Sequence, residues 1–241
     1  MKKVIIGLLM VFFLVVETFA ATGESYLNKY MMMAVKKGDI ATIRLLKEKG
    51  ANLNIKDRKG NSLLMLSIYL GYDDIFEYLV KNGANYLLTD NSGRSPLILS
   101  IYLDRGNMIN YMLDSGLLEG LNIKDISGKT ALMIAVAKGD KKLVTKLLKL
   151  GANPNEKDKL GRTPLAEAMD LNLPEITKIL LENQGKANHS IDKERDLLRY
   201  ATFSGDAGII RNMLAEKRET TESDSKYAIV IIERNIFLKK Y

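Results

Sequence analysis

The chain has no cysteine, no tryptophan and one histidine, His189, among its 241 residues. The lack of cysteine excludes a thiol nucleophile, disulfides and thiolate ligands for zinc. A lone histidine excludes a His-rich zinc site and leaves a serine–histidine–aspartate triad dependent on a single polar loop. Neither G-x-G-x-x-G nor the P-loop pattern G-x-x-x-x-G-K-[ST] occurs. We therefore predict a protein without catalytic residues, metal ligands or cofactors.

The formal net charge is +7, and it falls to +6 without Lys2, Lys3 and Glu17 of the N-terminal segment. Such a surplus could attract nucleic acid, anionic lipid or an acidic protein. The lysines are, however, scattered along the chain with glutamates and aspartates between them. We interpret the charge mainly as a source of solubility, and we expect no nucleic-acid partner.

The N-terminus is typical of an export signal. Two lysines precede an apolar run from Val4 to Val16, and Thr18-Phe19-Ala20 offers a cleavage site. The run matches the roughly 7–15 residues of a signal core and falls short of the about 20 that span a bilayer. A buried first helix is disfavoured because the run is apolar on every face. An uncleaved anchor remains open because Phe19 is bulky.

A signal cleaved after Ala20 predicts a periplasmic or secreted protein with no membrane contact after cleavage. The short two-lysine start is typical of bacteria.

The rest of the chain repeats itself. Gly60, Gly93, Gly128 and Gly161 are 33, 35 and 33 residues apart, and each is followed two residues later by Ser or Thr. Self-similarity at this period indicates a solenoid, in which stacked units bury faces that no single unit can bury. A helical bundle is disfavoured because it needs no fixed period.

Three motifs recur in register within this repeat. Ser95-Pro96-Leu97 and Thr163-Pro164-Leu165 predict helix starts, since Ser or Thr caps a helix and Pro suits its first position. Gly83-Ala84-Asn85 predicts a left-handed glycine that ends a helix. Together the motifs resemble the ankyrin-repeat family over about Tyr26 to Lys217. The resemblance implies an all-α solenoid of about six repeats that is not an enzyme.

The repeat pattern predicts the following organisation: a signal peptide at 1–20, a linker at 21–25, repeats at 26–57, 58–90, 91–125, 126–158 and 159–190, a degenerate sixth repeat at 191–218 and a C-terminal capping tail at 219–241. Two extra residues near Glu119-Gly120 should enlarge one loop without disturbing the stack. Residues 227–232 could form a capping helix or, by their β-branched content, a strand, and we favour the helix.

Two departures from the family pattern stand out. Where the family has a histidine after its T-P-L motif, this chain has Met65, Ile98, Met133 and Ala166, which replaces polar links between repeats by apolar contact. Glu167 occupies a position that the family gives to a buried leucine. It is either a functional carboxylate or, by our preferred interpretation, a residue at a tilted helix end or in an ion pair with a nearby lysine.

The resemblance implies a partner surface made of the turn tips and the two residues before the end of each inner helix, and it leads us to expect a monomer that binds a protein. The expected partner-binding residues are Tyr69, Leu70, Tyr102, Leu103, Ala137, Lys138, Arg58, Lys59, Asn91, Ser92 and Lys159. The same mapping points to Lys36 and Lys37 in the first repeat. Exposed tyrosines are favoured at binding hot spots, although Tyr69 and Tyr102 could instead pack between inner helices. The alternative function is a scaffold that shields or stabilises an envelope enzyme or assembly.

Overall fold

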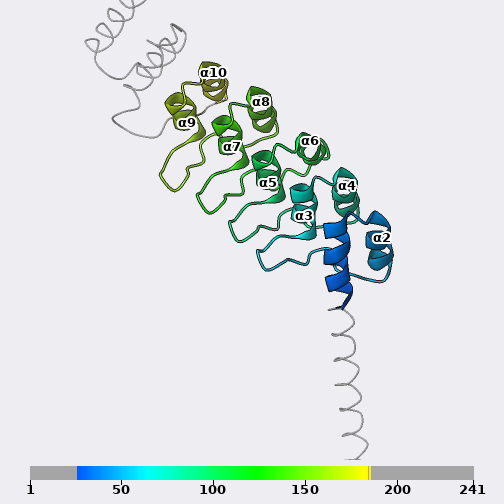
Figure 1. Ribbon diagram of the computed structural model, residues 1–241. Coiled ribbons are helices and arrows are strands. Elements are labelled where there is room, and N and C mark those ends of the chain that lie inside the picture. The colour runs from blue at the N-terminus through cyan, green and yellow to red at the C-terminus, as the bar shows by residue number, and fades with distance from the viewer. Residues whose placement is uncertain (1–25, 184, 186–241) are drawn as a thin grey trace, which may run out of the picture. The chain divides into compact units, whose positions relative to one another are not determined.

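The computed structural model describes residues 26–183 and 185, which form helices joined by turns with no strand among them (Figure 1). The segments predicted as signal peptide (1–20), linker (21–25), sixth repeat (191–218) and capping tail (219–241) lie outside the described residues, as does His189. Within the described part of the chain, no helix is both long and apolar enough to cross a membrane.

The chain divides into two compact units after Ile126. In the first unit, residues 26–37 are helical. They are followed by α2 (Ile40–Glu48), α3 (Leu63–Leu70), α4 (Asp73–Lys81), α5 (Pro96–Tyr102) and α6 (Gly106–Asp114). Helix α3 packs on α4 and α5, and α4 packs on α6. Within this unit α3 and α5 lie beside the long turns, and α4 and α6 lie on the other side (Figure 1).

The second unit begins at Ser127 and repeats the arrangement. It contains α7 (Ala131–Ala137), α8 (Lys141–Lys149), α9 (Pro164–Asp170) and α10 (Pro174–Glu182). Helix α7 packs on α8 and α9, and α8 packs on α10. Stacked helix pairs joined by turns confirm the predicted all-α repeat architecture.

The helices beside the turns begin where the sequence predicts. Ser62, Ser95, Thr130 and Thr163 each accept a hydrogen bond from the backbone N–H three residues later. This bond satisfies one of the donors that a helix start leaves without a partner, and such a cap contributes about 1 kcal/mol. Two of these helices end differently from the others: Asp104 and Asn172 adopt the left-handed conformation at φ 54°, where the other repeats have glycine.

The core lies between stacked helices. Leu147 and Leu148 are buried, and at the matching positions of α4 Leu79 is buried and Val80 half-buried. Phe76 is fully buried, and its ring meets the Tyr111 ring edge to face at 5.9 Å between centroids.

The apolar residues that stand in place of the family's histidine are mostly buried, as expected. Met65, Ile98 and Met133 are buried, while Ala166 is half-buried. Burial of three large apolar side chains replaces the polar network by contacts that contribute through the hydrophobic effect.

The extra residues of the third repeat form additional turns after α6. The backbone N–H of Leu121 donates to Leu118 O, and that of Ile123 donates to Gly120 O, at 3.1 and 3.2 Å. The next turn tip still reaches its neighbour, because Ile126 N donates to Ser92 O at 2.8 Å. The longer loop therefore leaves the register of the tips unchanged.

Candidate partner-binding groove

An aspartate fixes the shape of each long turn in the first unit. Asp57 Oδ1 accepts hydrogen bonds from the backbone N–H groups of Lys59 and Asn61 at 2.8 and 2.9 Å, and its Oδ2 accepts from the Asn61 side chain. Burial acts to raise the pKa of Asp57, but these hydrogen bonds, with the charge of Lys36, outweigh it and lower the pKa. The carboxylate is thus ionised and occupied by the turn itself.

Successive turn tips are bonded to one another through the backbone. Asn91 N donates to Lys59 O at 3.2 Å. The tip must be glycine here: Gly60 has φ +79°, and a Cβ on it would lie 2.8 Å from Asn91 N. A side chain would therefore meet both backbone strain and the next turn.

A groove of about 1190 Å³ opens between residues of helix 26–37, helix α3 and the turns before and after it. Its apolar floor is formed by Met32, Ile55, Leu66 and Tyr69, of which Leu66 is buried and the other three half-buried. A floor of this kind offers apolar area to a bound side chain, and contiguous accessible apolar surface on a folded protein often marks an interaction site.

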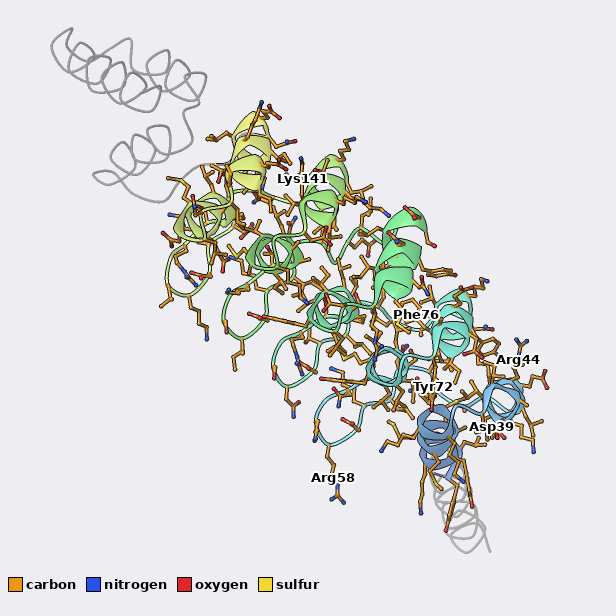
Figure 2. All side chains as sticks on the ribbon, turned by 45° about the horizontal axis from the view of Figure 1, so that its top comes forward. Asp39, Arg44, Arg58, Tyr72, Phe76 and Lys141 are labelled. Carbon is orange, nitrogen blue, oxygen red and sulfur yellow. The ribbon has the colours of Figure 1, made fainter. Side chains whose placement is uncertain are left out.

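The walls of the groove are strongly basic. Six basic residues and two aspartates line it: Lys29, Lys36, Lys56, Arg58, Lys59 and Arg94, with Asp57 and Asp90. Figure 2 shows the Arg58 side chain extending from the outer end of its turn, away from the helices. These six basic residues, which lie apart in the sequence, thus line one surface of the first unit.

Six of the residues expected at the partner surface lie together in this groove. They are Lys36, Arg58, Lys59, Tyr69, Asn91 and Ser92. Leu70, Tyr102 and Leu103 belong to the same unit and are exposed, but they do not line the groove.

The two tyrosines of the expected surface are not simply solvent-facing. Arg94 Nη2 donates to the Tyr69 hydroxyl at 2.6 Å, and its guanidinium carbon lies 5.9 Å from the centre of the Tyr69 ring. The Tyr102 hydroxyl donates to Asp125 Oδ2 at 3.1 Å, although Tyr102 is 39% exposed. Both rings therefore reach from a helix to the following turn, so each is part of the turn's support as well as of the surface.

Arg94 links the groove wall to the turn scaffold. Its guanidinium also lies 2.6 Å from Asp90 Oδ2, a carboxylate whose side chain is only 2% exposed. Burial acts to lower the pKa of Arg94, but Asp90 and the Tyr69 hydroxyl outweigh this and raise it. The positive charge of Arg94 is therefore paired with the Asp90 carboxylate at this point of the wall.

The remaining expected residues, Ala137, Lys138 and Lys159, are exposed in the second unit.

In the second unit Glu167 is buried, with 6% of its surface exposed, and its Oε1 lies 2.7 Å from Lys129 Nζ. The ion pair expected for Glu167 is confirmed, whereas the other preferred interpretation, a helix end tilted to the surface, is wrong because the side chain is buried. Among the described residues no group of histidine, cysteine, aspartate or glutamate side chains could hold a metal ion.

Beyond Lys36 and Lys37, sequence reasoning missed the contribution of the first helix, and it missed the turn bases. Lys29 and Met32 were not expected at the surface, although with Lys36 they stand at the i, i+3 and i+7 spacing that puts residues on one helix face. Lys56 and Arg94 were also missed, since each lies just outside the tip positions that the repeat pattern marks. The helix-face spacing was the one available signal.

Comparison with known families agrees with the repeat architecture. The family model for ankyrin repeats (3 copies) matches residues 31–125, 85–158, 115–193 and 132–226. The overlapping matches cover residues 31–226, well over half of the chain.

Proposed function

Because the chain belongs to the ankyrin-repeat family, whose repeats are generally non-enzymatic protein–protein interaction modules, we propose that it binds a protein partner through the groove of its first unit and the turn tips beside it. The observation that carries the proposal is the groove itself: an apolar floor with charged, exposed walls, lined by several of the residues expected to bind a partner. Binding sites commonly combine such an apolar centre with a polar rim.

Site-specific photo-crosslinking tests this function. A photoreactive residue at position 59 or 92 lies at the groove, whereas one at position 142, on the exposed side of α8, serves as control. In cells expressing the full chain, we expect a discrete crosslinked protein from both groove positions and none from the control. The scaffold alternative predicts crosslinks without preference for the groove, and the absence of any groove crosslink would contradict our proposal.

We further propose that the protein is exported to the periplasm or secreted. Lys2, Lys3, the apolar run of residues 4–16 and Ala20 support this proposal. N-terminal sequencing of protein from cell fractions should then begin at Ala21. A cytoplasmic product that retains Met1 would contradict export, without bearing on the groove.

A further inference from the structure

We infer that the groove recognises an acidic, extended segment of the partner protein in which acidic residues flank one apolar side chain. The inference rests on the proposed function and adds the chemistry of the partner. It follows from the charge that remains without compensation in the groove, and from the shape and composition of the groove floor.

The carboxylates of the groove do not neutralise its cations. Asp57 and Asp90 direct their oxygens at their own turns: Asp57 at the N–H groups of Lys59 and Asn61, and Asp90 at Ser92 and Arg94. Of the six cations only Arg94 is paired with one of these two carboxylates. The groove therefore presents an excess of positive charge to solvent.

Four of the cations are available to a ligand. Lys29, Lys36, Arg58 and Lys59 have no carboxylate within ion-pair distance among the described residues. Lys29 and Lys36 come from helix 26–37, and Arg58 and Lys59 come from a turn tip, so the charge borders the groove from two elements. Like charges along such a cleft raise the local concentration of an oppositely charged ligand and speed its association.

The floor of the groove favours a ligand that has an apolar side chain between its acidic side chains. Met32, Ile55 and Tyr69 are half-buried and retain accessible surface beside the buried Leu66. In an extended peptide successive side chains point to opposite sides. One apolar side chain directed at this floor therefore leaves its neighbours free to reach the lysines and arginine of the walls.

Nucleic acid fits this surface less well than a peptide does. Single-stranded nucleic acid binds to basic grooves that also supply aromatic faces for base stacking. Tyr69 is the aromatic residue that lines this groove, and its ring and hydroxyl are both engaged by Arg94. The other floor residues are aliphatic or methionine, which suits an apolar amino-acid side chain.

Selection from a randomised peptide display library against the immobilised full chain tests the inference. We expect the recovered peptides to be enriched in Asp and Glu around one apolar residue. The affinities of synthetic copies for the full chain are then measured by fluorescence anisotropy over a range of salt concentrations. Copies in which Gln and Asn replace Glu and Asp should lose binding.

Matched charge reversals locate the binding. Arg58→Glu with Lys59→Glu should weaken binding of the acidic peptides by at least ~10-fold and flatten the salt dependence. The control, Lys142→Glu with Lys178→Glu, changes the net charge equally on exposed positions of α8 and α10. It should change the affinity by less than ~2-fold, because neither lysine lines the groove. Circular dichroism melting of both variants verifies that the fold is intact.

Several outcomes overturn the inference. They are recovery of no peptide, recovery of peptides without acidic enrichment, and equal weakening by both double variants. Displacement of the peptide by a single-stranded oligonucleotide at comparable affinity would make the groove a general polyanion site and would also overturn it. If crosslinking at positions 59 and 92 still captures a protein in these cases, the proposed function stands and only the acidic chemistry fails.

Discussion

In the first unit, Arg94 ties the turn before α5 to α3, with its guanidinium 2.6 Å from the Tyr69 hydroxyl. In the second unit, Lys129 ties the turn before α7 to α9, with its ammonium 2.7 Å from the Glu167 carboxylate. Tyr69 lies in the floor of the groove and is half-buried, whereas Glu167 is buried. Both links therefore join a turn to a helix. In the first unit the link is a partly exposed hydrogen bond between arginine and tyrosine, and in the second it is an ion pair between lysine and a buried glutamate.

The two units share the residues that build their turns and differ in the side chains that those turns expose. Asp90 and Asp158 make the same pair of backbone hydrogen bonds in their turns, each within 2.8–2.9 Å. Beyond that scaffold, the first unit exposes Arg58 and Lys59 at a tip, while the second exposes Leu160, 76% of whose surface is accessible. A common scaffold therefore carries surfaces suited to different contacts.

The largest expected effect tests whether the two units share equivalent cores. Leu79 of α4 and Leu147 of α8 are both fully buried. Replacement of either by Ala should lower the free energy of unfolding by roughly 2–5 kcal/mol, from lost apolar burial and the cavity left behind. Urea denaturation of the two variants measures this, and a loss below about 0.5 kcal/mol for either would show that its side chain is not in the core.

A glycine pair tests the close approach of the turns. Gly128 has φ +79°, and a Cβ there would lie 2.7 Å from Lys159 N, whereas Gly151 has φ +93° and open space around it. Gly128→Ala should cost about 2–4 kcal/mol through strain plus overpacking, and Gly151→Ala about 1–2 kcal/mol through strain alone. Equal unfolding midpoints for the two variants would refute the tip-to-tip contact.

The two links between turn and helix should respond differently to removal of one partner. Lys129→Met leaves a buried carboxylate without its cation and should cost roughly 1–3 kcal/mol. Glu167→Leu should cost less, because the Lys129 side chain is 22% exposed and its ammonium can reach solvent. Tyr69→Phe should cost only about 0.5–1.5 kcal/mol, because Arg94 keeps its bond to Asp90. Thermal unfolding of the three variants ranks them, and a larger loss for Tyr69→Phe than for Lys129→Met would reverse the comparison.

The smallest expected effect is on acid stability. Burial acts to raise the pKa of Asp57 and of Asp158. Hydrogen bonds outweigh it, from Asn61 and backbone N–H groups to Asp57 and from Arg162 and backbone N–H groups to Asp158. The pKa of each carboxyl in the folded protein therefore lies below its ordinary value. Each carboxyl therefore stabilises the fold above its unfolded pKa of about 3.9, and this contribution is lost as the pH falls toward the folded value. Asp57→Asn should flatten the loss of stability between about pH 6 and about pH 3. Urea midpoints across that range measure it, and an unchanged slope would contradict the assignment.

The sequence was sufficient for the repeat scaffold because that scaffold depends on local chemistry. Ser62 and Thr163 cap helices, and Gly60 takes a left-handed turn, through contacts with residues only a few positions away. Recurrence of those residues at a fixed period was enough to predict the helix starts and the stacking.

The groove could be predicted only in part. The tip residues Arg58 and Lys59 follow from the repeat register, but the Tyr69–Arg94 contact joins residues 25 apart and the Lys129–Glu167 pair joins residues 38 apart. Which of several nearby lysines meets a given carboxylate depends on side-chain packing between repeats. Apart from the spacing of Lys29 and Lys36 on one helix face, there was little sign in the sequence that the basic residues gather, because charges of both signs are interspersed along it.

The backbone bonds between tips bear on how such a chain can lengthen in evolution. Each bond runs in one direction, with the later turn donating: Asn91 N to Lys59 O in the first unit, and Lys159 N to Ser127 O in the second. Among the described residues, the turn at Asn91 and Ser92 thus has both an N–H for its predecessor and a carbonyl for its successor, since Ile126 N donates to Ser92 O. A tandem duplication of one repeat in the gene would bring its own matching donor and acceptor, so the new unit could join the row wherever it was inserted. Such a row is open to growth by copying, while the side chains on its tips remain free to diverge.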